Sequence, residues 1–291
     1  MNKLVFAQRF LLLITSLITG SASAPFIICI GALPSQAATL AASDAMVELN
    51  NFNHSPTSVD ALTDTNTFTF ASNGSVTAEA DANALAQFDP NNPPEGFSNV
   101  SLSHTSGEGS SYRGLAESLA GVIGYNFIIG SGETFSFDFQ DSLDLASSVD
   151  NPKLESASAD GNIALKLYDS TDPNNLLPLD YLTISGNLAT PGNGNSLNID
   201  RSANISFNSS ETSIGGTKQS AEVSVQGSLS RNFDRETHLT LEEFKTNQAS
   251  VSASVPEPSQ DLALLFGFGL VCFGETVRRK AFGSRSKGLP F

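Results

Sequence analysis

The middle of the chain, residues 38–254, alternates apolar and polar positions in short runs that turn-forming residues separate. Phe135, Phe137 and Phe139 stand at every second position of one run, with polar side chains between them. A period of two is the spacing of a β-strand, and one dry face with one wet face is typical of antiparallel sheets. The same alternation recurs at residues 68–70, 163–167, 205–207, 223–225 and 248–255.

Many short strands with frequent turns favour an all-β fold, which we predict to be an antiparallel β-sandwich of jelly-roll-like type. Residues 115–123 and residues 238–245 also fit one face of a helix, and their assignment stays open. The Pro- and Asn-rich stretch 89–96 is expected to be a surface loop and a candidate boundary between a short N-terminal lobe and the main sandwich. Predicted turns are Asn73-Gly74, Asp160-Gly161, Asp172-Pro173-Asn174-Asn175, Gly192-Asn193-Gly194 and Gly215-Gly216.

The first 37 residues have the three parts of a secretory signal peptide. Basic residues near the start precede an apolar run from Phe10 to Leu33, and small residues precede an expected cut after Ala37. An earlier cut after residue 24 is disfavoured by the proline that follows it. An uncleaved membrane anchor is the alternative, and export of residues 38–254 follows from either.

The last segment, residues 255–291, combines a proline-rich box, an apolar run and a basic cluster. The apolar run Leu262–Val277 predicts a transmembrane helix, although its sixteen residues are slightly fewer than the roughly 20 that span a bilayer core. Its glycines make it a poor soluble helix, which argues against a buried core helix. Basic residues after the helix should stay in the cytoplasm, which places residues 38–254 outside. A buried core helix and a lipid-anchor signal are less suitable alternatives. The box is Val255, Pro256, Glu257 and Pro258, and the basic stop is Arg278, Arg279 and Lys280.

This C-terminal arrangement resembles the PEP-CTERM sorting signal of bacterial exported proteins. The resemblance implies that a membrane enzyme of the exosortase type removes the tail after export. Residues 125–248 also look like the body of an uncharacterised group of such proteins that is common in cyanobacteria. That second resemblance rests on residues 132–138, 167–175 and 184–187, and it implies no known activity.

Charge is distributed unevenly along a chain whose formal net charge is −15. Seven of the fifteen basic residues lie in the two end segments, which leaves eight Lys and Arg against 27 Asp and Glu between residues 38 and 255. A body this acidic repels phosphate backbones, so we expect no binding of nucleic acid through a basic face.

Few residues of the body carry the chemistry that catalysis needs. Cys29 and Cys272 lie in the end segments, so the body has no disulfide and no thiol nucleophile. His54, His104 and His238 are too far apart in sequence for a typical zinc pair, and each is expected at a solvated loop or strand end. A Gly-x-Ser-x-Gly turn is absent from the sequence, and we predict that the protein is not an enzyme.

One loop has the composition of a calcium site. Asp169, Asp172 and Asn174 offer the carboxylate and amide oxygens that calcium prefers, although the loop lacks the central Gly and closing Glu of an EF-hand. The alternative, which we favour, is a Pro-Asn turn whose Asp side chains accept hydrogen bonds from local amides. No other cofactor is expected.

The sequence therefore predicts an exported cell-surface or extracellular-matrix protein, sorted and cleaved by an exosortase-type enzyme. Its expected role is structural or adhesive, in a setting rich in exopolysaccharide that the sorting resemblance implies. Expected partners are a signal peptidase, the exosortase-type enzyme, exopolysaccharide, and the membrane before processing. A calcium-assisted, lectin-like carbohydrate-binding module is the alternative, and a secreted glycoside hydrolase is less favoured because aromatic sugar platforms are scarce.

Overall fold

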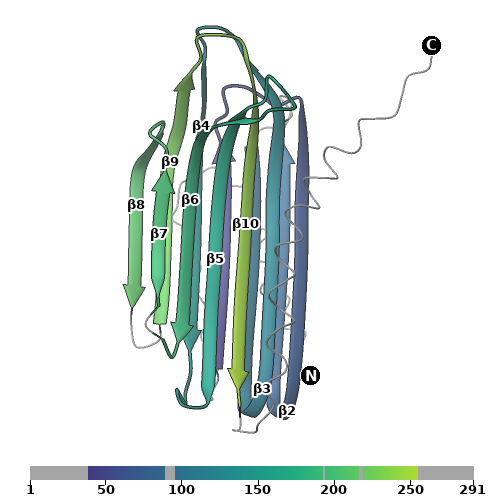
Figure 1. The fold of residues 1–291 in the computed structure, drawn as a ribbon, viewed down its shortest axis with the longest axis vertical. Helices are drawn as coiled ribbons and strands as arrows, with labels where there is room; N and C mark the ends of the chain where they lie inside the picture. The colour runs from purple at the N-terminus through teal and green to yellow at the C-terminus, as the bar shows by residue number, and fades with distance from the viewer. Residues whose placement is uncertain (1–38, 89–95, 193, 216–218, 255–291) are drawn as a thin grey trace, which may run out of the picture. The chain divides into compact units, whose positions relative to one another are not determined.

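The computed structural model describes residues 39–88, 96–192, 194–215 and 219–254, and these form ten antiparallel strands (Figure 1). The predicted export signal (1–37) and sorting signal (255–291) lie outside the described residues. Within the described ranges, no helix is long and apolar enough to cross a membrane. The strands are β1 (Thr39–Asn50), β2 (Ser58–Gln87), β3 (Gly96–Ile129), β4 (Thr134–Ser148), β5 (Glu155–Asp169), β6 (Leu177–Thr190), β7 (Ser196–Arg201), β8 (Ile205–Gly215), β9 (Gln219–Asn232) and β10 (Thr237–Ala253).

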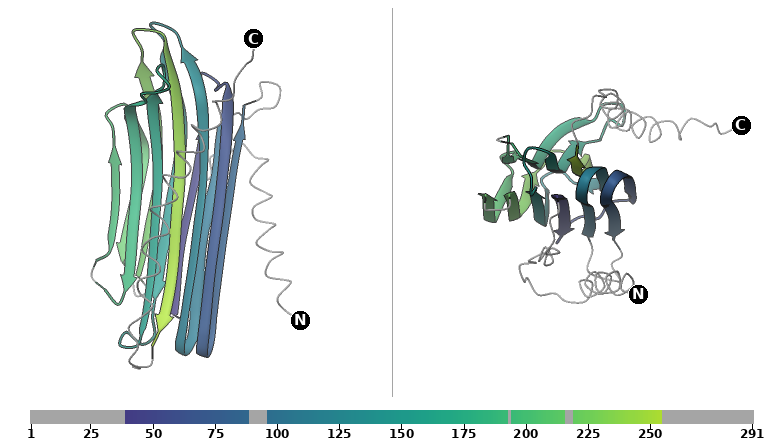
Figure 2. Two further views of the ribbon diagram at one scale, coloured as in Figure 1. Left: turned by 45° about the vertical axis from the view of Figure 1, so that its right-hand side comes forward. Right: turned by 90° about the horizontal axis from the view of Figure 1, so that it is seen from below.

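The strands form a single sheet with the order β7-β6-β5-β10-β3-β1-β4-β9-β8, and β2 pairs with β3 beside this path. The sheet curls so that β1 faces β5 and β10, and β4 faces β5 and β6, across the interior. Figure 2 shows the curl in the view along the strands. The prediction of an all-β antiparallel fold is confirmed. The nine strands of the path form a nearly closed, barrel-like sheet rather than a clear sandwich, which corrects the finer prediction.

A bend in the long β2–β3 hairpin produces this curl. Gly74 in β2 and Gly109 in β3 have positive φ angles of 136° and 112°, a conformation that glycine adopts without strain. Beyond the bend β3 folds back along its own inner face, where the Ser118 hydroxyl lies 2.8 Å from that of Ser101. The first half of β3 therefore pairs with β1, and its second half pairs with β10.

The interior changes in character along the strands. At the end away from the bend, phenylalanines from β1's following loop and from β3 and β4 pack together; Phe52 and Phe137 stack with ring centroids 5.0 Å apart. Near the bend, alanines and valines pack around buried Tyr112, whose ring fills the space left by Gly107. The small side chains near the bend let the two halves of the sheet lie close together there, whereas the phenylalanine rings fill the wider space at the other end. Both clusters bury apolar surface, which stabilises the fold.

Several local predictions need correction. The segments 115–123 and 238–245 are strand, within β3 and β10, so their helical alternative is wrong. Asp160-Gly161 is not a turn but lies inside β5, where a side chain at Gly161 would collide with Leu143. Asn73-Gly74 is the bend of β2 and not a hairpin turn. The predicted loop 89–96 falls largely outside the described residues, and the strands on either side of it pair with each other, so it does not divide two lobes.

Other local predictions agree with the structure. Asp172–Asn175 connects β5 to β6, and Gly192 and Gly194 lie between β6 and β7. Phe135, Phe137 and Phe139 are buried, as their alternation indicates. The run at Phe68 and Phe70 is also strand, but Phe70 is 57% exposed and lies in a half of β2 whose side chains are exposed on both faces.

Candidate functional site

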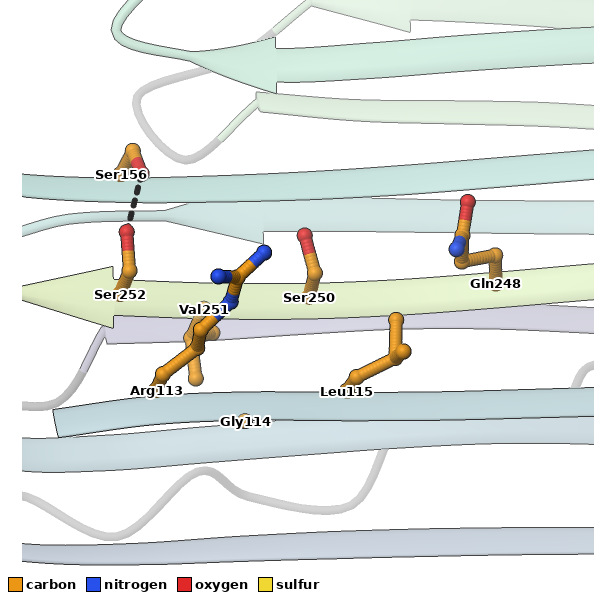
Figure 3. A pocket seen from close by; sticks show the side chains of 8 residues that line it. All are labelled: Arg113, Gly114, Leu115, Ser156, Gln248, Ser250, Val251 and Ser252. Carbon is orange, nitrogen blue, oxygen red and sulfur yellow. Dashed lines mark hydrogen bonds between the residues drawn. The ribbon is translucent and has the colours of Figure 1, made fainter. Parts of the chain in front are cut away.

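A shallow pocket of about 460 Å³ lies on the outer face of β3, β10 and β5 (Figure 3). Ser156 and Ser252 face each other across β5 and β10 with their hydroxyl oxygens 2.8 Å apart, and the adjacent pair of Ser158 and Ser250 repeats this spacing. The Arg113 side chain extends from β3 toward β10 in the same view. The residues that line the pocket are Arg113, Gly114, Leu115, Ser156, Gln248, Ser250, Val251 and Ser252.

The register of antiparallel pairing places these polar groups together. Ser156 pairs with Ser252, and Ser158 pairs with Ser250, so one hydroxyl from each strand falls on the outer face at every second position. At the end of this ladder, the Gln248 amide donates to Glu117 at 2.9 Å. Hydroxyls, an amide and a guanidinium can bind a hydroxyl-rich ligand, but the lining holds no histidine, cysteine or carboxylate that could act as a base or nucleophile.

A row of acidic side chains crosses the outer face of the other half of the sheet. Asp44 on β1 pairs with Asp144 on β4, which pairs with Glu222 on β9. Burial, and then the charges of Glu222 and Asp44, raise the pKa of Asp144 to about 7. Like charges directly opposite one another are destabilising in a sheet. Among the described residues, no group of three His, Cys, Asp or Glu side chains is placed to hold a metal ion.

His104 at the edge of this row is the histidine with the closest charged partner. Its Nε2 lies 2.5 Å from Asp44 Oδ1, whose side chain is almost fully buried. Burial lowers the pKa of His104, but the hydrogen bond and charge of Asp44 outweigh that effect and leave the pKa above its ordinary value. His54 lies after β1, 3.4 Å from Glu133, and His238 lies near the start of β10. The three histidines sit in different surroundings and do not form one site.

The predicted calcium residues lie in and beside the β5–β6 turn and make local contacts. Asp169 Oδ1 accepts from the backbone N–H of Thr171 at 2.9 Å, and its Oδ2 lies 3.3 Å from Arg235. Asp172 accepts from the backbone N–H of Asn174 at 3.0 Å. Burial raises the pKa of Asp169, but the hydrogen bonds from Thr171 and the Arg235 contact outweigh it and lower the pKa. The arrangement is that of a hydrogen-bonded turn, and calcium binding stays a prediction.

A group of charged and polar residues lies in the middle of the interior, where the alternation predicts apolar side chains. Glu243 and Lys245 on β10 are both 0% exposed, and Lys245 Nζ lies 3.2 Å from Glu243 Oε1. The other carboxylate oxygen of Glu243 accepts from the Asn99 amide on β3. Asp141 on β4 is buried nearby, and the charges of Glu243 and Lys245 both act on its pKa. We call Asn99, Asp141, Glu243 and Lys245 the interior polar cluster.

Burial dominates the ionisation of the interior polar cluster. It raises the pKa of Asp141 well above its usual range and raises that of Glu243. It lowers the pKa of Lys245, although the neighbouring carboxylates act in the opposite direction. Taking charges out of water costs several kcal/mol per ion. Burial therefore favours the neutral acid forms of Asp141 and Glu243 and the neutral amine form of Lys245.

Hydroxyl and amide groups surround the cluster on the side toward the bend. Asn247 accepts from Ser43 Oγ at 2.7 Å and donates to the backbone oxygen of Ser101 at 2.7 Å, so its amide is satisfied. Asn99 Oδ1 and Asp141 Oδ1, in contrast, have no hydrogen-bond partner among the described residues. Sequence reasoning missed this cluster. The available signal was that Glu243 and Lys245 are in phase with the apolar positions of β10.

Comparison with known proteins gives no relative for this chain: no family model, no curated protein and no solved structure matches it. Its function has to be argued from its own residues.

Proposed function

We propose that this chain is an exported, non-enzymatic cell-surface or extracellular-matrix protein with a structural or adhesive role associated with exopolysaccharide. The observation that carries the proposal is the shallow pocket on the outer face of β3, β10 and β5, which we call the outer polar pocket. Its serine ladder, Gln248 amide and Arg113 guanidinium offer donors and acceptors to a hydroxyl-rich polymer, and its lining holds no histidine or carboxylate that could activate a serine hydroxyl. Repeated weak contacts of this kind along a sheet suit adhesion to an extended ligand.

The charge of the body and the composition of the two end segments support the same location. A body with 27 acidic and eight basic residues stays hydrated and repels other polyanions, unless divalent cations bridge them. Residues 1–37 have the composition of an export signal, and residues 255–291 resemble a PEP-CTERM sorting signal. We propose that a signal peptidase and an exosortase-type enzyme process the two ends, and that the C-terminal segment holds the chain in the membrane until then.

The leading alternative is a calcium-assisted, lectin-like module in which the Asp169–Asn174 turn takes part. The two candidates differ in the residues they use, because Gln248 and Arg113 lie on a different surface from that turn. Chelation should abolish sugar binding in the lectin and leave binding by the outer polar pocket unchanged. The less favoured glycoside hydrolase would instead release reducing ends from a polysaccharide.

Binding of the purified full chain to exopolysaccharide from the producing cells tests the proposal. Gln248→Ala removes an amide from the outer polar pocket and should weaken binding several-fold. Gln226→Ala is the matched control, because it makes the same change at an exposed position of β9 in the other half of the sheet. Equal losses in both variants, or no binding by the unaltered chain, would contradict an adhesive role for this pocket. A deletion strain with unchanged aggregation and biofilm would contradict the role in the cell.

A further inference from the structure

The interior polar cluster joins parts of the chain that are distant in sequence. Asn99 lies in the first half of β3, which pairs with β1, whereas Glu243 and Lys245 lie in β10. Glu243 touches both of the others: one carboxylate oxygen is 3.2 Å from Lys245 Nζ, and the other accepts from the Asn99 amide. A carboxyl group therefore bridges an amine and a carboxamide inside the sheet.

The surroundings favour the reactive forms of these groups. A lysine is a nucleophile only as the neutral amine, and burial lowers the pKa of Lys245 toward that form. A carboxyl group transfers protons best when it exchanges readily between acid and carboxylate, and burial raises the pKa of Glu243. The Asn99 carbonyl oxygen has no hydrogen-bond partner, so it is open to a donor.

We propose that Lys245 and Asn99 form an intramolecular isopeptide bond, and that Glu243 transfers the protons of this reaction. Rotation of the Asn99 amide exchanges its oxygen and nitrogen, so that Glu243 in its acid form donates to Oδ1. The lone pair of Lys245 Nζ attacks Cγ of Asn99. A Nζ–Cγ bond forms, and the Cγ–Nδ2 bond breaks.

The step balances without an added reactant. As the Nζ–Cγ bond forms, Glu243 gives its own proton to Oδ1 and, now a carboxylate, takes one proton from the amine. It passes that second proton to the leaving nitrogen of Asn99 and recovers its own proton from Oδ1 as the carbonyl group forms again. Ammonia departs, and Glu243 returns to its starting state. The product is one amide between the side chains of β3 and β10.

Neighbouring groups fit the role of acceptor less well than Asn99 does. The Asn247 amide is engaged on both sides, by Ser43 and by the backbone of Ser101. Asp141 acts on Lys245 through its charge, but Glu243 contacts Asn99 directly and no such bridge joins it to Asp141. A link to Asp141 would release water instead of ammonia, which makes the two acceptors distinguishable by mass.

The bond would have a clear structural use. The predicted body contains no cysteine, so it has no disulfide. An amide between Lys245 and Asn99 would tie the two facing halves of the sheet together covalently. A link that closes a long loop restricts the unfolded chain and stabilises the folded one.

Mass spectrometry of the folded full chain, denatured before measurement, tests the proposal. The peptide that contains Lys245 should be joined to the one that contains Asn99, and the joined mass should be one ammonia below the sum of the two. Asn99→Asp should form the same link with loss of water, so that its product and the unaltered product have equal mass. Lys245→Arg keeps a buried cation that cannot make the bond, and should show both peptides unlinked.

Glu243→Gln separates the role of the carboxyl group from that of the reactants. This variant keeps the size of the side chain and should remain unlinked, or link far more slowly, while unfolding cooperatively. Unlinked peptides in the folded unaltered chain would overturn the proposal. Loss of water in the unaltered chain, with Asp141 in the joined peptide, would overturn the choice of Asn99. Linkage in Glu243→Gln at the unaltered rate would overturn the role of Glu243.

Discussion

Replacing Asp144 by Asn should stabilise the protein in mildly alkaline solution and leave it almost unchanged in acid. Asp144 lies between Asp44 and Glu222 on neighbouring strands, partly buried on the outer face. Burial and these two carboxylates raise its pKa from 3.8 to about 7. The folded chain therefore holds this proton more tightly than the unfolded chain does.

The direction of the pH effect follows from that difference. Because the folded pKa is the higher one, the contribution of Asp144 to stability is greatest below pH 3.8 and is lost as pH rises through about 7. One pKa unit corresponds to about 1.4 kcal/mol, so ionising Asp144 costs at most ~4 kcal/mol above pH 8. Solvent around this partly exposed side chain reduces the cost, and we expect Asp144→Asn to gain about 2–3 kcal/mol there.

Urea unfolding at pH 4 and at pH 8.5 measures this gain. Asp64→Asn is the matched control, because it removes one acidic charge from the exposed edge half of β2, outside the acidic row. The gain in Asp144→Asn should appear at pH 8.5 and fall below about 0.5 kcal/mol at pH 4. An equal gain at both pH values, or an equal gain in the Asp64 variant, would refute repulsion within the acidic row as the cause.

Three further predictions concern packing, the bend and a buried ion pair. Phe137→Ala removes a buried ring from the phenylalanine cluster and should cost about 3–5 kcal/mol in urea unfolding. Gly74→Ala should lower the melting temperature more than Gly132→Ala does. Both glycines have positive φ, but only at Gly74 would the new Cβ lie 2.0 Å from a backbone oxygen. Equal melting temperatures would contradict this. Arg231→Ala leaves the buried Asp180 carboxylate without the cation 2.9 Å away, and should cost about 2–4 kcal/mol at pH 7, measured by the same unfolding assay.

The sequence was sufficient to predict the antiparallel strands because alternation of apolar and polar residues reports directly on which face is buried. Phe135 to Phe139 shows this in β4, where each buried ring was identified from its spacing. The path of the sheet could not be predicted in the same way. Pairing of β10 between β3 and β5 joins strands far apart in sequence, and alternation contains no information about which strands are neighbours.

Glycine was the least reliable guide to where the strands turn. Asn73-Gly74 has the composition of a hairpin turn, but the strand continues through it and only changes direction. The sequence also predicts a turn at Gly161, but this residue lies inside β5, where Leu143 and Asn247 occupy the space that a side chain would need. A local pattern cannot distinguish a glycine required by its backbone angles from one required by close packing.

Charges inside the sheet were hidden for a related reason. Glu243 and Lys245 interrupt the apolar positions of β10, and this made residues 238–245 resemble a helical face. Only the fold shows that Asn99 and Asp141 meet them in the interior. The interior polar cluster therefore depends on contacts between strands. The sequence contains its four residues but does not show that they lie close together.

The bend of β3 also determines how the protein would respond to mechanical force. β1 begins at Thr39 opposite Gly107, and β10 ends at Ala253 opposite Tyr112, so both strands leave the sheet beside the bend. Tension applied at these two points loads the backbone hydrogen bonds one pair at a time, so the strands separate sequentially. This pulling geometry offers the least resistance to unfolding by force. A covalent tie at Lys245 would stop the separation of β10 after its last eight residues, 246–253, and the sheet beyond the tie would bear the load.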